Sequence, residues 1–478
     1  MKKFLIFAVV LSLLLPAAAF AATEFSLGGF IKLDAFWDST QAGKNLNGGV
    51  ARDNDPNFHH GQMRYTAQGS RFNFTIKGPK VFGAQVTGFI EMDFDGQNAT
   101  TATGFAPAAA GNVTLAPYND VGSSSVYTPR LRHAMFRFNW PETELLLGQY
   151  WSMFCEWYIE SAEDGPLQAT GTPTARIPQI RLTQTFLGDW MVAGLIGNPN
   201  SAILPGTNAA AINSTSPYSV NANNGMAAET PQIQGKIRYA HDWWGKAPYY
   251  GAPTPFTAQV VAGWQRNIVR TNAAITGTGI TAPGTAVTFS LPNQFVAPWM
   301  VMGTLFIPVI PTHSANLAGT AHILTQWWIG QGVEAYGFTG SSAAVLHLSD
   351  AFSWDVSPLK RWGGLAEAQY YFDNQWFINA AYAITKVYGV RQGFNVDGDF
   401  LTTTSGLTGV NAQLNAMQQV DATLWYRPIQ AIKFGLQYSY AHTTFMTRIN
   451  GAGGFAANTD LSNKGDEHRV EFAGFFFF

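Results

Sequence analysis

The chain of 478 residues has little charge and only one cysteine. Charged residues make up 12% of the sequence, against about 25% in an average soluble protein. The single thiol, Cys155, has no partner for an intrachain disulfide and cannot build a thiolate metal cluster, and the sequence contains no C-x-x-C-H haem motif. After the first residues there is no run of about 18 apolar residues, so a membrane-spanning helix is not expected.

Aromatic residues (14%) and glycine (48 residues) are plentiful instead. A soluble protein with so little charge would need a very large core. One large β-barrel is therefore favoured over two or three soluble domains, because barrels often exceed the usual domain size as a single unit. The formal net charge is −2 and becomes −4 when Lys2 and Lys3 are removed, which gives no reason to expect nucleic acid as a partner.

The first 21 residues have the pattern of a secretory signal peptide. Residues 2–3 are basic, residues 4–15 are apolar, and the AFA sequence at 19–21 fits a small-x-small cleavage site. We therefore expect residues 1–21 to be removed and residues 22–478 to form the mature protein. An exported chain with a membrane-like composition and no spanning helix must use β-strands to satisfy its backbone in lipid.

The end of the chain alternates between two kinds of side chain. Val470, Phe472 and Phe476 share one face, while Arg469 and Glu471 lie on the other. A period of two predicts a strand with two different faces. This segment, which ends on an aromatic residue, resembles the C-terminal strand of Gram-negative outer-membrane β-barrels, in which the closing aromatic residue serves as an assembly signal.

Similar alternation recurs along the chain, with short turns and long polar loops between the segments. The least defined parts are 299–309, which is apolar on both faces, and the linkers 241–255 and 310–319. The sequence predicts an all-β fold, a transmembrane antiparallel β-barrel of about 16 strands with long extracellular loops and both termini in the periplasm. With the C-terminal segment, the predicted strands are 25–37, 64–77, 82–95, 130–140, 142–151, 177–187, 190–197, 232–241, 256–266, 299–309, 322–336, 361–373, 376–387, 419–427 and 431–442.

The third long loop, residues 152–176, is the strongest candidate for a pore constriction. About sixteen strands enclose a lumen too wide for wall side chains to fill, so the barrel must hold water or be constricted by something folded inside. We predict that this loop folds inward, that its acidic side chains face basic wall residues, and that the charges orient solutes. Arginine suits carboxylates because its planar fork binds them bidentately. The predicted constriction residues are Arg71, Arg137, Arg181, Arg132, Arg176, Glu156, Glu160, Glu163 and Asp164.

Each of these arginines has an alternative role, in which it solvates the lumen or braces the loop through a salt bridge. On the neighbouring strand, Gln149 and Trp151 are predicted to face the interior. Three segments around the loop, RLRHA at 130–134, LGQYWSMF at 147–154 and RIPQIR at 176–181, resemble the constriction region of DcaP-like trimeric porins. The resemblance implies a sixteen-stranded homotrimer with an inward-folded third loop, which passes small solutes and often anionic ones such as dicarboxylates.

Three classes of function remain to be compared. The first is a passive diffusion channel for small solutes and ions, surrounded by membrane lipid and lipopolysaccharide. The second is a barrel sheath around a periplasmic multihaem electron-transfer protein. The third, an outer-membrane hydrolase, is disfavoured by the strand number and by the lack of a recognisable Ser/His pairing. We predict no enzyme activity and no cofactor. We also predict no metal site, because residues 93–96 resemble the start of a calcium-binding loop but the later ligands of such a loop are missing.

Overall fold

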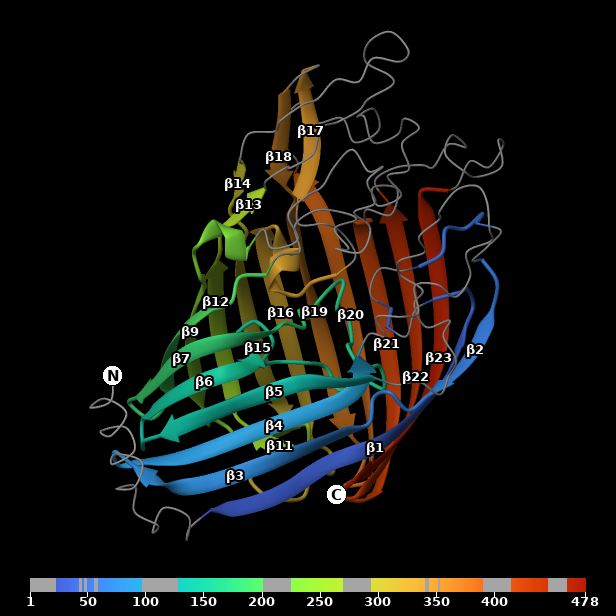
Figure 1. Ribbon diagram of the computed structural model, residues 1–478. Coiled ribbons are helices and arrows are strands. Elements are labelled where there is room, and N and C mark those ends of the chain that lie inside the picture. Colours follow the sequence, from blue (N-terminus) through green and yellow to red (C-terminus); the bar gives the residue numbers. More distant parts are fainter. Residues whose placement is uncertain are drawn as a thin grey trace, which may run out of the picture.

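The computed structural model describes residues 23–42, 45–46, 50–55, 59–96, 128–200, 225–269, 294–339, 344–350, 353–389, 414–445 and 462–478. The predicted signal peptide lies outside these residues. The described residues form a closed antiparallel barrel (Figure 1). Its sheet contains 17 strand segments, of which β2 and β3 pair with successive parts of β1 and so make one interrupted strand. The barrel therefore has 16 strands, and the predicted fold class is confirmed.

The barrel closes where β1 pairs with β23, the first strand with the last. Among the described residues, no helix has the length and apolar character needed to cross a membrane. The barrel strands are β1 (Glu24–Asp38), β2 (Gln62–Thr66), β3 (Arg71–Val81), β4 (Ala84–Gly96), β5 (Thr128–Asn139), β6 (Thr143–Trp151), β7 (Arg176–Phe186), β8 (Trp190–Gly197), β9 (Gln232–His241), β12 (Phe256–Trp264), β15 (Trp299–Ile310), β16 (Ala321–Gln331), β19 (Lys360–Tyr371), β20 (Trp376–Gly389), β21 (Leu414–Ile429), β22 (Ile432–Phe445) and β23 (Lys464–Phe477).

Short elements lie at the two ends of the barrel. The hairpins β13–β14 (Asn267–Val269, Gln294–Val296) and β17–β18 (Ala344–Asp350, Ser353–Pro358) project from one end, which is the upper end in Figure 1. The hairpin of β10 (Ala247–Tyr249) and β11 (Ala252–Thr254) belongs to the other end, where the chain also terminates. Two short 3-10 helices, η3 (Met226–Ala228) and η4 (Val333–Tyr336), complete the described elements.

The alternation in sequence becomes an alternation in exposure. On β1, Phe25 and Leu27 are 72% and 59% exposed on the outer face, whereas Lys32 and Asp34 are 2% and 1% exposed on the inner face. The same outward apolar pattern recurs around the wall, so the barrel carries a band of exposed apolar side chains that suits lipid rather than water. Further members of this band are Ile180, Leu182, Val260, Leu436 and Phe472.

Two predicted strands differ from the observed ones. The predicted strand 322–336 ends at Gln331, because Gly332 has a φ of +60° and the next four residues form η4. The predicted strand 64–77 is interrupted by a turn in which the Ser70 amide donates to the Ala67 carbonyl. In both places a local turn ends the regular pairing, and the apolar pattern alone does not reveal it.

Candidate pore constriction

Residues 152–175, which we call the constriction loop, leave β6 and fold into the barrel before β7 begins. Their acidic side chains reach three parts of the wall. Glu156 accepts hydrogen bonds of 2.7 Å from Lys236 on β9. Glu160 accepts a hydrogen bond of 2.8 Å from Lys433 on β22. Asp164 accepts a hydrogen bond of 2.6 Å from Arg71 on β3. Because β9 lies far around the barrel from both β22 and β3, the loop crosses the lumen from wall to wall.

One side of the constriction loop packs against apolar wall residues. The Phe154 ring lies 5.1 Å from Tyr336, and the Trp157 ring lies 5.8 Å from Phe306 on β15. Met153, Phe154 and Cys155 belong to a buried cluster with side chains from β7, β8, β12, β15, β16 and η4, while Ile159 and Leu167 pack on β19 and β20. We call this filled space, between the loop and β12 to β21, the packed half of the lumen.

The other side of the lumen is lined by arginines on β3, β5 and β7. Arg137 and Arg181 lie over the Tyr150 ring at 4.8 and 5.3 Å, and Arg176 and Arg132 lie over the Trp151 ring at 4.7 and 5.7 Å. Guanidinium groups are attracted to the faces of aromatic rings, so Tyr150 and Trp151 hold these four side chains in place. We call this region, the inner face of β3 to β7, the arginine half.

A β-bulge brings Arg132 into the arginine half. Glu91 of β4 pairs with His133 and Met92 pairs with Leu131, so Arg132 is an extra residue in β5. A bulge of this kind turns two consecutive side chains to the same face. Arg132 and His133 are accordingly both buried on the inner side, while Leu131 is exposed on the outer side.

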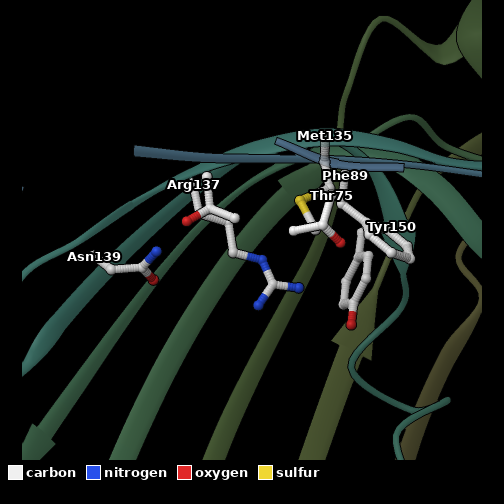
Figure 2. Close-up of a pocket in the computed structure, with 7 residues that line it drawn as sticks. Thr75, Phe89, Met135, Arg137, Asn139 and Tyr150 are labelled. Atoms are coloured by element: carbon white, nitrogen blue, oxygen red, sulfur yellow. The ribbon is translucent and has the colours of Figure 1, made fainter. Parts of the chain in front are cut away.

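A cavity of about 350 Å³ lies in the arginine half. Figure 2 shows the Arg137 side chain extending between Asn139 and Tyr150, with Thr75 and Phe89 nearby. The remaining lining residues, Thr87 and Met135, come from β4 and β5. A space with one guanidinium, hydroxyl and amide groups and aromatic rings has the chemistry to admit a small polar solute and to attract an anion.

Most of the arginine charge is compensated by carboxylates. Arg132 binds Glu91 and Asp93 at 2.6 Å each, and Arg181 binds Glu156 at 3.3 Å. Arg137 lies 3.4 Å from Glu144, and Arg71 holds Asp164. Among the described residues no carboxylate lies within salt-bridge distance of Arg176. Adding Arg130 and Lys236 to the five arginines named above gives seven cations. Their six carboxylate partners are Glu91, Asp93, Asp95, Glu144, Glu156 and Asp164, so this set of side chains has an excess of one positive charge.

Two of the predicted acids lie elsewhere. Glu160 is buried beside Lys433 and Gln369, and Glu163 accepts from the Leu46 amide and lies 3.8 Å from Arg469. Burial raises the pKa of the Glu163 carboxyl, and Arg469 opposes this rise. The structure thus brings seven of the nine predicted residues to the arginine half. It places Glu160 beside β19 and β22 and Glu163 beside β23, where they fix the loop to other parts of the wall.

Sequence reasoning missed Tyr150, which contacts two of the arginines. Gln149 was predicted to face inward, but Leu147 pairs with the outward Phe136, so Gln149 shares the outer face and Tyr150 the inner one. A shift of one residue reverses the faces along a strand, but Trp151, at the end of β6, still contacts the inward side chains of Arg132 and Arg176, as predicted. Leu146 pairs with both Arg137 and Arg181 and is fully buried, so it faces inward as they do. Its pairing with two inward arginines is the observation that places Tyr150 on the inner face.

Comparison with known proteins gives a fold. No family model matches the chain, and no curated protein matches it. The solved outer membrane channel DcaP of Acinetobacter baumannii superposes with a TM-score of 0.62 at 15% identity, over 96% of this chain and 98% of that chain. The Vibrio cholerae outer membrane protein OmpT gives 0.46 at 10% identity over 97% and 100%, and Salmonella typhi OmpF in complex with Daunomycin gives 0.47 at 10% over 95% and 97%. The predicted resemblance to DcaP-like porins is confirmed at the level of the fold, which is that of an outer-membrane channel.

Proposed function

We propose that this protein is a passive channel of the Gram-negative outer membrane for small hydrophilic solutes, with a modest preference for anions such as carboxylates. The observation that carries the proposal is the group of arginines held on one inner wall beside an open cavity, inside a barrel whose outer face suits lipid. Solutes would pass between the constriction loop and β3 to β7. Diffusion of this kind involves no covalent step, so no enzyme activity is proposed.

The alternative of a sheath around a multihaem protein has less support. A sheath needs a wide lumen along its whole length, whereas the constriction loop and the residues packed on it fill one half of this lumen. One cavity in the other half has a volume of about 350 Å³, which is within the range of a small-molecule site. Transport of small solutes is therefore the better fit.

The proposal includes a cellular setting. Residues 1–21 would be removed as a signal peptide, and the barrel would assemble as a homotrimer in contact with lipid and lipopolysaccharide. Both ends of the described chain lie at one end of the barrel, since the Gly29 and Phe478 backbones exchange hydrogen bonds of 3.2 Å. We assign that end to the periplasm. Stepwise conductance in groups of three, recorded in planar bilayers, would support a trimeric channel.

The anion preference can be tested with a double substitution, Arg137→Ala with Arg181→Ala. At about 8 Å in water one unit charge is worth about 0.5 kcal/mol to a passing ion, and salt near 0.1 M roughly halves this energy. Removing two charges therefore changes the partitioning of anions and of cations roughly twofold each, in opposite directions, so their ratio changes roughly fivefold. We expect the anion-to-cation permeability ratio, measured from the reversal potential in a potassium chloride gradient, to fall by about that factor. An unchanged reversal potential would remove these two arginines from the filter.

A matched control removes the same charge from other places. Lys464 is exposed at the start of β23 and lies 3.5 Å from Asp53, and Lys360 is exposed at the start of β19. The pair Lys464→Ala with Lys360→Ala should leave the reversal potential close to that of the wild type. If it shifts the potential as far as the arginine pair does, the selectivity reflects overall charge rather than the arginine half.

A further inference from the structure

The hairpin of β10 and β11, residues 247–254, leaves the wall and folds beneath the constriction loop. It follows β9 and precedes β12, at the end of the barrel where the chain terminates. Its base is fixed to the wall, because the backbones of Lys246 and Thr312 exchange hydrogen bonds of 3.0 and 2.8 Å. Ala247 is fully buried against Trp157, Phe306 and Leu324. We call residues 247–254 the inner hairpin.

Two tyrosines join the inner hairpin to the backbone of the constriction loop. The Tyr249 hydroxyl accepts a hydrogen bond of 2.8 Å from the Tyr158 amide and donates one of 3.1 Å to the Tyr158 carbonyl. The Tyr250 hydroxyl donates one of 2.7 Å to the Ile159 carbonyl. The Tyr249 ring also lies 4.7 Å from Trp157. All these contacts fall between Glu156 and Glu160, the part of the loop that crosses the lumen.

The inner hairpin reaches across the mouth of the barrel. At Gly251, at its tip, the position where a Cβ would lie is 3.5 Å from the Arg427 guanidinium on β21. Its base lies between β9 and β12, several strands away from β21 around the wall. A segment held at its base and in contact with the loop through its side chains can fix the height and tilt of the loop above it.

The tip of the inner hairpin is a two-residue turn in which Tyr250 and Gly251 have φ values of +50° and +77°. Asn-Gly is the sequence that this type of turn favours. The same conformation occurs at Leu187-Gly188, with φ values of +52° and +75°. The Leu187 side chain is 85% exposed, whereas Tyr250 is 48% exposed with its hydroxyl bound to the loop. The two turns share a backbone and differ in whether the first side chain contacts the loop.

We propose that the inner hairpin positions the constriction loop, with Tyr249 and Tyr250 as positioning residues that set the width of the passage. The inference rests on the proposed channel function. It adds that the loop is held from the periplasmic mouth as well as by its salt bridges to the wall. Since the hairpin contacts are made by uncharged side chains, loosening them removes no charge, so it changes the size and steadiness of the pore more than its charge selectivity.

The test uses Tyr250→Asn in the full-length protein. Asparagine keeps the turn, because Asn-Gly favours this conformation, but its side chain is too short to reach the Ile159 carbonyl. Losing one hydrogen bond of typical strength raises the population of the displaced loop roughly fivefold. We expect larger open-channel current noise and higher mean single-channel conductance in planar bilayers, with the reversal potential of the wild type. Tyr249→Phe should act in the same direction, since it removes a hydroxyl and keeps the ring.

Leu187→Asn is the matched control, because it makes the same change in the same turn type without touching the loop. It should leave conductance and noise at wild-type values. The proposal is overturned if Tyr250→Asn and Tyr249→Phe both match the wild type in conductance and noise, or if Leu187→Asn changes them equally. Should Tyr250→Asn fail to assemble, Tyr249→Phe alone decides between these outcomes. The channel function is tested separately, by the effect of Arg137→Ala with Arg181→Ala on the reversal potential. The proposal about the inner hairpin can therefore be overturned while the channel function is supported.

Discussion

The two halves of the lumen are built on the same strand pattern and end with opposite chemistry. In the packed half the inward residues of β15 include Met300, Met302 and Phe306, which are almost completely buried. In the arginine half the inward residues of β5 and β7 include Arg137, which lines the cavity, and Arg181, which is buried beside the Tyr150 ring. The strand alternation decides which residues point inward. Apolar side chains of the constriction loop face the inward residues of β15, which are apolar, whereas the backbone of Glu160 bonds the buried polar residues Glu367 and Asn379 on β19 and β20.

This difference explains a strand that was hard to interpret from sequence. The segment 299–309 is apolar on both faces because β15 has lipid on one side and the constriction loop on the other. A strand that is buried on both faces is apolar throughout. An apolar inward run such as that of β15 therefore marks where an internal segment packs through apolar side chains.

The largest expected contrast concerns thiol reactivity in the two halves. Cys155 is fully buried in the packed half, its Sγ accepts a hydrogen bond of 3.1 Å from the Ala175 amide, and burial raises the pKa of the thiol to about 12. Raising a thiol pKa from about 9 to about 12 lowers the thiolate fraction at pH 8 roughly a thousandfold. We compare the folded wild type, whose thiol is Cys155, with a variant that combines Thr75→Cys with Cys155→Ser. The rate of labelling by maleimide should be lower in the wild type by about that factor or more.

Thr75 lines the cavity of the arginine half, so its replacement reports on water access there. Labelling is followed by mass spectrometry in detergent at pH 8, and denaturation should make Cys155 reactive again. Equal labelling rates for the two thiols in the folded protein would mean that the packed half is open to solvent, and the comparison between the halves would collapse.

A smaller contrast concerns stability. Trp157 packs on Phe306, Tyr249 and Leu324 in the packed half, whereas Tyr150 borders the cavity. Truncating a large buried side chain typically costs about 3–5 kcal/mol of folding free energy. We expect Trp157→Ala to destabilise the barrel by about 3 kcal/mol and Tyr150→Ala by less than about 1 kcal/mol, measured by denaturant unfolding in micelles.

The conductance of the two variants should follow a similar division. Trp157→Ala loosens the loop and should increase current noise, whereas Tyr150→Ala frees Arg137 and Arg181 and should alter selectivity instead. A larger loss of stability from Tyr150→Ala than from Trp157→Ala would reverse the roles assigned to the halves.

Much of the fold follows from the sequence because lipid on one side of a strand forces strict alternation. That rule predicts the strand number, the class of fold and the inward arginines Arg71, Arg137 and Arg181. It does not locate the bulge at Arg132, because an extra residue changes no composition. It does not find the inner hairpin either, since residues 241–255 have no regular pattern and their inward course depends on tertiary contacts with Trp157 and Tyr158.

The acidic residues of the loop show a second limit. Glu156, Glu160, Glu163 and Asp164 are equivalent in sequence, as four carboxylates on one polar loop. Their surroundings separate them, because the loop crosses the lumen and each carboxylate meets whichever basic side chain lies nearest on the wall. Which acids border the passage is therefore set by the course of the loop, and that course is fixed by packing far along the chain.

The smallest expected effect separates two of these carboxylates by charge selectivity. Glu156 borders the arginine half and compensates Lys236 and Arg181, so Glu156→Gln should raise the anion-to-cation permeability ratio about twofold, as expected for one charge near the passage. Glu160 faces Lys433 on the far side of the loop, so Glu160→Gln should leave the ratio unchanged. It should instead destabilise the barrel by about 3 kcal/mol or more, because a buried lysine loses its partner. Reversal potentials and denaturant unfolding, measured on both variants, test the assignment. A selectivity change from Glu160→Gln as large as that from Glu156→Gln would mean that ions pass on both sides of the loop, and the division of the lumen would have to be redrawn.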